Sequence, residues 1–224
     1  MSGAWVVLWA AVGGVLGFVV GRTCLVLERS EQVGDDAQPG ERMGPSWIEG
    51  ALLPLLGLVG FAAFAHAQGA TWRLLVHSLW LVVLLLVLAF DLKHRLILDV
   101  VTFPALVLAL VLAHWSPGLS VTSAIAGALF GGVVLLPLAL ASDLFQRGTG
   151  FGWGDVKLGM VIGAITGMSF NLDGLHTLWA LIAGALVGGV VSVALLASRR
   201  LSLKDTIPYG PFLVAGAGLV LFFL

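Results

Sequence analysis

Long apolar runs separated by short polar segments make up most of this chain. A transmembrane helix needs about 20 mostly apolar residues to cross a hydrocarbon core about 30 Å thick. Eight candidate runs lie near residues 4–27, 48–66, 74–90, 97–114, 120–141, 155–170, 175–198 and 207–224, of which the sixth and eighth are short. The pattern therefore predicts an all-α fold, a polytopic integral membrane bundle of about eight transmembrane helices.

Composition supports a membrane location. Hydrophobic residues make up 59% of the 224 residues and charged residues 10%, whereas about a quarter of the residues in soluble domains are charged. The first run has no Lys or Arg ahead of it and no small-residue cleavage site after it, so we expect it to remain as a helix. A net charge of -1 provides no basic patch, which argues against nucleic acid as a partner.

The positions of Lys and Arg orient the predicted bundle, because short cytoplasmic loops accumulate positive residues. The odd-numbered connections and adjoining helix ends hold Arg22, Arg29, Arg42, Lys93, Arg95, Arg147, Lys157, Arg199, Arg200 and Lys204. The even-numbered connections hold only Arg73. Both termini are therefore expected on the non-cytoplasmic side.

Three further features receive structural interpretations. The polar segment from Glu28 to Trp47 is expected to be a solvated cytoplasmic loop. Cys24 is the single cysteine, so it forms no intrachain disulfide and is expected to contact lipid or packed side chains. We expect glycines in the seventh run to allow close helix packing; these are Gly184, Gly188 and Gly189.

Two aspartates at helix ends are the candidate functional residues. Asp91 lies where the third run ends and Asp155 where the sixth begins, both on the predicted cytoplasmic face. Ionisable residues at the edge of a spanning segment are functional candidates. A helix cap is an alternative role for Asp155. The helix macrodipole disfavours a carboxylate at the position of Asp91, although Lys93 and Arg95 could offset that cost.

Other polar residues near this face receive simpler interpretations. Asp99 is expected to be the N-cap of the fourth helix, Asp143 a loop residue and His94 a solvated loop histidine. The remaining histidines are too scattered to predict a zinc site; they are His66, His77, His114 and His176. No metal and no cofactor are predicted.

Paired carboxylates suit peptide hydrolysis. Two carboxyl groups that converge on one water can share a proton, so that one acts as base and the other as acid. Neither a metal nor a covalent nucleophile is required. The glycines at positions 150, 152 and 154 would let the backbone approach an extended substrate and turn sharply before the helix.

Four segments resemble the type IV prepilin peptidases, whose catalytic aspartates lie in an Asp-x6-Pro-Asp/Asn segment and a Gly-x-Gly-Asp-x-Lys-Leu segment. These segments are Gly152-Trp153-Gly154-Asp155-Val156-Lys157-Leu158 with Gly163 and Gly167 following, Asp91 at the family spacing from Asp99, Ile207-Pro208-Tyr209-Gly210-Pro211-Phe212-Leu213, and Trp47-Ile48-Glu49. Leu98 stands where the family commonly has proline. The resemblance implies that Asp91 and Asp155 are catalytic. It implies substrate-binding or loop-shaping roles for Gly152, Gly154, Lys157, Asp99, Pro208 and Gly210.

The resemblance covers residues 45–224 and implies a membrane aspartic endopeptidase in the cytoplasmic (inner) membrane of a prokaryote. Its substrate would be a pilin-like precursor with a basic leader and a hydrophobic helix, and membrane lipids would surround it. Residues 1–47 would form a first helix and short loop, a reduced methyltransferase region, and residues 48–224 the peptidase membrane domain. Many family members carry paired Cys-x-x-Cys motifs in the first loop. This chain lacks them, which puts N-methyltransferase activity in doubt.

Two other functions stay open at this point. A small transporter or channel would use intramembrane carboxylates near mid-depth, whereas a scaffold of pilus or secretion machinery would cleave nothing. The acidic residues of the first loop could attract a basic leader; they are Glu28, Glu31, Asp35, Asp36 and Glu41. The sequence leaves the oligomeric state undetermined.

Overall fold

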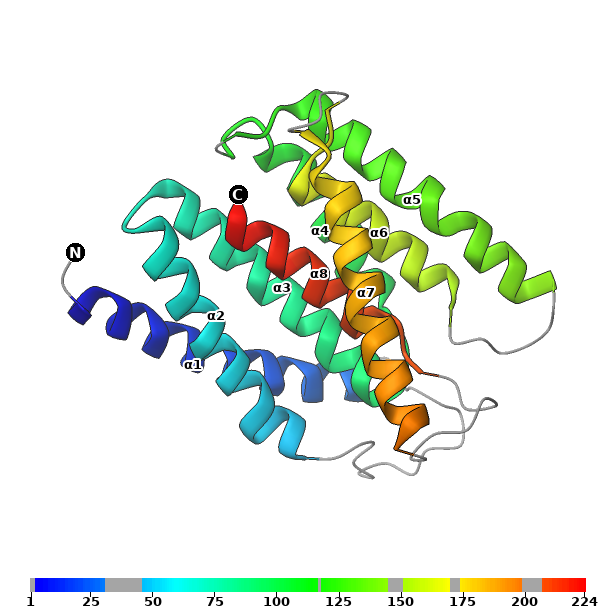
Figure 1. Ribbon diagram of the computed structural model, residues 1–224. Helices are drawn as coiled ribbons and strands as arrows, with labels where there is room; N and C mark the ends of the chain where they lie inside the picture. The colour runs from blue at the N-terminus through cyan, green and yellow to red at the C-terminus, as the bar shows by residue number, and fades with distance from the viewer. Residues whose placement is uncertain (1–2, 31–45, 117, 145–150, 170–173, 199–206) are drawn as a thin grey trace. The chain divides into compact units, whose positions relative to one another are not determined.

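Helices joined by short connections make up the part of the chain that the computed structural model describes, with no β-strand there (Figure 1). The described residues are 3–30, 46–116, 118–144, 151–169, 174–198 and 207–224. In chain order the helices are α1 (Gly3–Ser30), the π-helix η1 (Ile48–Leu52), α2 (Leu53–Gln68), α3 (Trp72–His94), α4 (Asp99–Leu112), α5 (Val121–Leu144), α6 (Trp153–Thr166), α7 (His176–Ala197) and α8 (Gly210–Phe223). Each predicted apolar run overlaps one of them, so the all-α prediction is confirmed.

Five helical segments are long and apolar enough to cross a membrane: α1, η1 with α2, α3, α5 and α7. The helices α4 and α8 are apolar but shorter. Many large apolar side chains on these helices are exposed, among them Val15, Val107, Leu129 and Leu186. Surfaces of this kind suit lipid rather than water. The chain is therefore a multi-pass membrane protein.

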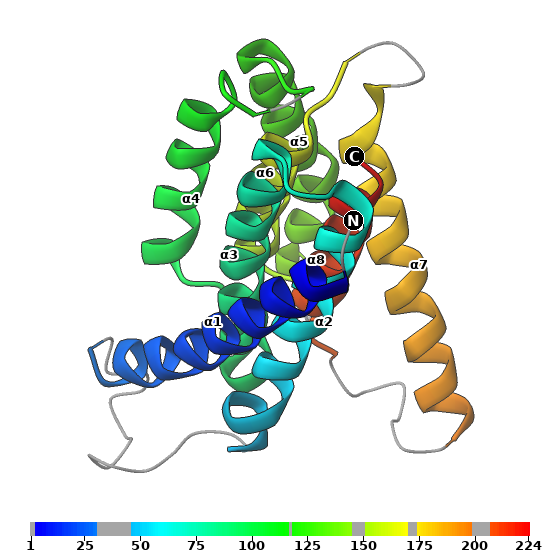
Figure 2. The ribbon, with the colours of Figure 1, turned by 90° about the vertical axis from the view of Figure 1, so that its left-hand side faces the viewer.

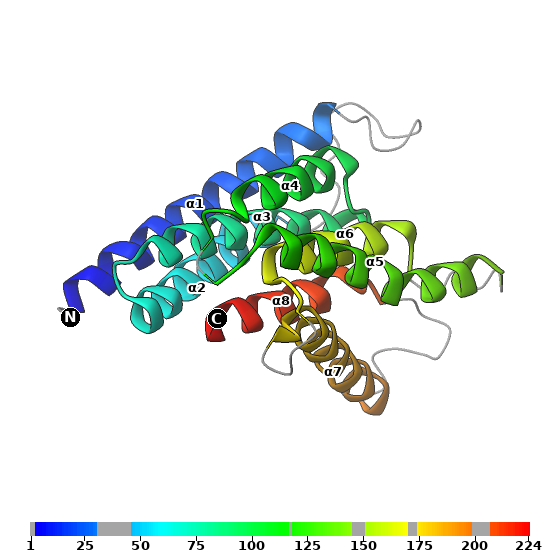
Figure 3. The same ribbon diagram turned by 90° about the horizontal axis from the view of Figure 1, so that it is seen from above.

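The chain divides into two compact units, an N-terminal unit from Met1 to Leu96 and a C-terminal unit from Ile97 to Leu224. The N-terminal unit contains α1, η1, α2 and α3, and the C-terminal unit contains α4 to α8. Within the C-terminal unit, α5 packs against α6 (Figure 2). In the same unit α7 packs against α8 (Figure 3).

Glycines allow the closest helix contacts in both units. A Cβ atom added at Gly17 of α1 would overlap the Leu53 backbone at the start of α2. In the C-terminal unit, a Cβ at Gly127 of α5 would overlap the carbonyl oxygen of Gly163 in α6, and the reverse holds at Gly163. Small residues let backbones approach in this way in membranes, where van der Waals packing drives helix association.

The three glycines singled out in the seventh run behave differently from one another. A Cβ at Gly184 would lie 2.9 Å from the Phe212 carbonyl oxygen of α8, and one at Gly188 would lie 3.0 Å from the Phe212 ring. A Cβ at Gly189 would meet no atom within 4 Å. The packing interpretation is confirmed for the first two and wrong for Gly189, because that position faces away from α8.

Gly163→Ala is expected to destabilise the C-terminal unit, because the added methyl group overlaps the α5 backbone. Overpacking of this kind costs about 1–3 kcal/mol, which thermal unfolding of the detergent-solubilised protein can register through its 8 tryptophans. Gly189→Ala is the matched control and should leave the apparent Tm unchanged. Equal apparent Tm values for the two variants would show that close α5–α6 contact is not required.

The predicted first loop begins later than expected. Glu28 lies within α1, which continues to Ser30, because its side chain has partners on α3 that are described below. Residues 31–45 lie outside the described residues, as do Arg147 and the basic residues Arg199, Arg200 and Lys204. The placement of both termini on the non-cytoplasmic side therefore stays a prediction.

Candidate functional site

Asp91 lies in the last turn of α3, in the N-terminal unit, with a 4% exposed side chain. The helix continues one turn past the predicted end and closes at Arg95, whose N–H donates to the Asp91 carbonyl oxygen at 2.9 Å. Arg95 has a φ of 55°, in the left-handed region, a conformation that commonly ends helices. Asp91 is therefore a buried carboxyl at a helix C-terminus.

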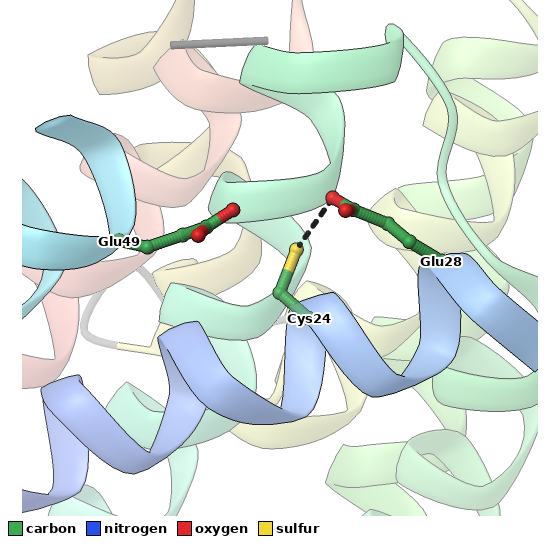
Figure 4. Close-up of side chains that lie close together, drawn as sticks. All are labelled: Cys24, Glu28 and Glu49. Carbon is green, nitrogen blue, oxygen red and sulfur yellow. Dashed lines mark hydrogen bonds between the residues drawn. The ribbon is translucent and has the colours of Figure 1, made fainter. Parts of the chain in front are cut away.

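A partly buried ion cluster lies at the same end of the N-terminal unit. The Lys93 ammonium forms ion pairs with both Glu28 of α1 and Glu49 of η1, and its side chain is only 2% exposed. His94 Nε2 lies 2.9 Å from Glu28 Oε1, and the Cys24 thiol donates to the same oxygen at 3.5 Å (Figure 4). We call these five residues the Lys93 cluster.

The cluster corrects two expectations and adds to a third. Lys93, expected to offset the charge of Asp91, forms ion pairs with Glu28 and Glu49. It is two residues from Asp91, and residues at that spacing do not share a helix face. His94 is the last residue of α3 with a 3% exposed side chain, and is not a solvated loop histidine. Glu28 is bound to Lys93 and His94 and is not free to attract a leader.

The remaining acidic residues proposed for leader attraction lie outside the described residues; they are Glu31, Asp35, Asp36 and Glu41. Cys24 is fully buried and belongs to packing, as one of its two expected environments. Ligand atoms of Cys24, Glu28 and Glu49 lie within 4.8 Å of one another, a spacing that a metal could use (Figure 4). Because the Lys93 ammonium already binds both carboxylates, we assign that cationic role to Lys93.

Asp155 is the third helical residue of α6, in the C-terminal unit, and its side chain is 5% exposed. Its Oδ2 accepts a hydrogen bond from the Gly152 N–H at 2.9 Å, and its own N–H donates to the Gly152 carbonyl oxygen at 3.1 Å. An acidic side chain at this position satisfies a free N–H and complements the helix macrodipole. The capping interpretation of Asp155 is therefore confirmed, and capping does not exclude a second role.

The two described glycines of the motif differ in their surroundings. A Cβ at Gly154 would lie 2.9 Å from Ile97 Cβ, so this glycine lets the start of α6 pack closely against the segment that precedes α4. A Cβ at Gly152 would meet nothing closer than 4.0 Å, and its φ of -130° is open to any residue. Gly152 is thus not needed for a sharp turn, and among the described residues no atom crowds it. Gly150 lies outside the described residues.

Lys157 and Asp99 join the starts of α6 and α4. Lys157 Nζ donates to Asp99 Oδ1 at 2.5 Å and lies 5.4 Å from the centroid of the Phe103 ring. The N-cap of α4 is Leu98 and Asp99 is the first helical residue, so the N-cap prediction for Asp99 is wrong. The two side chains are 32% and 56% exposed, and a pair this exposed contributes about 0–1 kcal/mol.

Asp143 also has a different role from the predicted one. It lies in the last turn of α5 and accepts a hydrogen bond from Trp153 Nε1 at 2.9 Å. Trp153 is the first residue of α6, so this contact holds the end of α5 beside the start of α6. The prediction of a loop residue is wrong because α5 extends three residues beyond the predicted end.

The Pro208–Gly210 segment lies close to the glycine motif. Gly210 is the buried first residue of α8, and the ring of Tyr209 lies 5.0 Å, centroid to centroid, from that of Phe151. Phe151 immediately precedes Gly152. Sequence reasoning did not select Tyr209 and Phe151 as site residues. The available signal was that each aromatic residue lies within or beside a motif segment.

The structure thus gathers the predicted site residues of the C-terminal unit around the start of α6. Ion pairing brings Asp99 to Lys157, and aromatic contact brings the Pro208–Gly210 segment to the residue before Gly152. Asp91 belongs to the N-terminal unit. Among the described carboxyl residues, Asp91 and Asp155 alone are classed as buried. These features define a multi-pass helical membrane protein with two buried aspartates at helix ends.

Comparison with known proteins identifies the family. Residues 78–193 match the sequence profile of the Type IV leader peptidase family, an interval that contains Asp91 and Asp155. The chain therefore belongs to the Type IV leader peptidase family.

Curated relatives agree with this assignment. The prepilin leader peptidase/N-methyltransferase of Pseudomonas aeruginosa is 30% identical over 174 residues, 77% of this chain and 49% of the relative. The protein of the same description from Burkholderia pseudomallei is 31% identical over 177 residues, 78% of this chain and 55% of the relative. Leader peptidase HopD of Escherichia coli is 33% identical over 135 residues, 60% of this chain and 83% of the relative.

The chain spans about half the length of the first two relatives. No solved structure matches the chain.

Proposed function

We propose that this protein is a membrane aspartic endopeptidase that removes the leader peptide from type IV pilin-like precursors at the cytoplasmic face of the membrane. The observation that carries the proposal is the burial of Asp91 and Asp155, 4% and 5% exposed, within the interval that matches the family. Buried carboxyl groups are costly unless function or partners retain them.

In the proposed mechanism, Asp91 and Asp155 act on one water molecule. The ionised carboxylate accepts a proton from the water, whose oxygen attacks the scissile carbonyl carbon. The protonated carboxyl donates a hydrogen bond to the carbonyl oxygen and later gives its proton to the leaving amine nitrogen as the C–N bond breaks. The reaction consumes one water and needs no cofactor.

The proposed substrate is a pilin-like precursor with a short basic leader and a following hydrophobic helix. The leader would stay in the cytoplasm while the apolar helix lies among membrane lipids and enzyme helices. No described residue crowds the position of a Gly152 Cβ, which supports a role for this backbone in contacting an extended peptide. Gly154, Lys157, Asp99, Pro208 and Gly210 would shape the surroundings of Asp155 through the contacts described above.

We further propose that the enzyme is a peptidase without N-methyltransferase activity, in the cytoplasmic membrane of a prokaryote. Residues 31–47 contain no cysteine. Leader peptidase HopD, which matches this chain over 83% of its own length, is described only as a peptidase. In this proposal, residues 1–47 are a reduced methyltransferase region and residues 48–224 form the peptidase domain.

Helix position argues against a transporter. Asp91 lies in the last turn of α3 and Asp155 in the first turn of α6, whereas transport sites lie near the membrane midplane between broken helices. Carboxyl groups at helix ends suit a reaction at the membrane surface.

Processing of an intact precursor tests the proposed function. Purified protein in lipid is mixed with a pilin-like precursor, and mass spectrometry locates the new amino terminus. We expect one cut between the basic leader and the hydrophobic helix, and no cut by the Asp91→Asn/Asp155→Asn double variant prepared in the same way. Failure of the wild-type protein to cut any such precursor would overturn the proposal.

A further inference from the structure

Three chain segments meet at the Lys93 side chain. Lys93 projects from the last turn of α3 and binds Glu28 near the end of α1 and Glu49 in the first turn of η1. The residues between these two carboxylates include the first interhelical segment. The 2% exposed Lys93 side chain therefore ties both flanks of that segment to the end of α3.

Lys93 acts on the helix turn that also carries Asp91. The two residues are two positions apart, on different faces of α3. On the backbone, the Asp91 carbonyl oxygen accepts the Arg95 N–H that closes the helix. The cluster therefore holds one side of this turn while Asp91 projects from another, and restraint of Lys93 limits rotation of the turn.

The ion pairs of the cluster are expected to fix the position of the Lys93 side chain more than they stabilise the fold. Buried ion pairs recover little net free energy after desolvation, yet removal of one member leaves an uncompensated buried charge. Two carboxylates that converge on one ammonium therefore hold its position strongly. Catalysis depends on such restraint, because displacement of a reacting group by about 1 Å can lower the rate by about 100-fold.

We propose that Lys93 is a positioning residue for Asp91. Through its ion pairs with Glu28 and Glu49, Lys93 fixes the last turn of α3. The inference rests on the proposed peptidase function for its kinetic consequence. Its structural consequence is independent of that function, since restraint of the helix end can be measured without substrate.

The test compares Lys93→Met, Lys93→Arg and the control Arg22→Met. Arg22 is an exposed cation on α1 outside the cluster, and its guanidinium lies 5.0 Å from the centroid of the Phe18 ring. Lys93→Met should lower kcat for precursor cleavage by about 10-fold or more with little change in KM. Lys93→Arg should restore much of kcat, because guanidinium can bind two carboxylates, and Arg22→Met should match wild type.

Hydrogen–deuterium exchange of peptides covering residues 86–96 supplies the readout that needs no activity. Lys93→Met should accelerate exchange of these amides while peptides from α2 keep wild-type protection, and Lys93→Arg should restore protection. A Lys93→Met protein with wild-type kcat, or with unchanged exchange at the end of α3, would overturn the positioning role.

The α2 peptides distinguish a general loss of folding from a local effect. If Lys93→Met lowers kcat and also accelerates hydrogen–deuterium exchange of the α2 peptides, the role of Lys93 is merely structural and the inference is overturned. If the wild-type protein cleaves nothing, the proposed function fails, while the exchange result still decides whether Lys93 restrains α3.

Discussion

The Asp155→Asn protein is expected to cleave precursor about 100-fold or more slowly than wild type while it retains its fold. Asparagine keeps a side-chain oxygen that can accept the 2.9 Å hydrogen bond from Gly152 N–H, but it cannot exchange the proton that general acid–base catalysis requires, a contribution of about 100- to 10,000-fold. The helix loses a charge that its N-terminus favours by about 0.3–1 kcal/mol, but the buried site is relieved of a charge, so the apparent Tm should stay close to that of the wild type. Single-turnover cleavage and thermal unfolding measure the two effects.

Two further variants separate capping from catalysis. Asp155→Ala removes both the cap and the carboxyl group, so it should be as inactive as Asp155→Asn and less stable. Asp143 is a nearby carboxylate outside the proposed pair. Asp143→Asn preserves an acceptor for Trp153 Nε1 and should retain activity. Cleavage at the wild-type rate by Asp155→Asn would reduce Asp155 to a helix cap.

The helices could be predicted because apolar runs of spanning length leave few alternatives in a membrane. Their ends were predicted less well. The helices α1 and α3 continue through polar residues such as Glu28, Lys93 and His94, which hydropathy assigns to loops. These residues stay helical and largely withdrawn from solvent because they pair with one another across about 65 positions of sequence. Periodicity within one run carries no information about such partners.

In the candidate site, too, features set by neighbouring residues could be predicted, whereas contacts between distant residues could not. The position of Asp155 at the start of α6 follows from the local glycine motif. The partner of Asp99 does not, because Lys157 is 58 positions away. Similarly, the contact between Tyr209 and Phe151 joins two motif segments that sequence reasoning treated separately. Local turn chemistry is readable from sequence, whereas pairs between helices depend on packing.

One sequence pattern gains meaning only from these pairs. Both candidate aspartates precede a lysine by two positions, as Asp91-Leu92-Lys93 and Asp155-Val156-Lys157. At that spacing on a helix the lysine does not share the face of the aspartate. In each unit the lysine instead binds carboxylates from another element, Glu28 and Glu49 in one and Asp99 in the other. Each lysine thus anchors a helix end through carboxylates of other elements.

Asp91→Asn is expected to slow cleavage as much as Asp155→Asn, about 100-fold or more, but with a different effect on stability. Asp91 lies at the C-terminus of α3, where a negative charge is unfavourable by about 0.3–1 kcal/mol, and its side chain is buried. A neutral amide of the same shape removes that cost, so the apparent Tm should equal or exceed that of the wild type. Catalytic groups held at such a cost to folding are typical of active sites.

Parallel cleavage and unfolding assays on the two Asn variants test this contrast. Asp91→Glu keeps the charge but displaces the carboxyl group, so it should lose activity without the gain in stability. If Asp91→Asn proves inactive and clearly less stable than wild type, Asp91 is needed chiefly for folding of the N-terminal unit. If it is stable and active, the proposed base–acid pair must be sought elsewhere. Inactivity at full stability would assign Asp91 to the chemistry, because asparagine keeps the size and shape of the side chain but supplies neither the negative charge nor the titratable proton that acid–base catalysis requires.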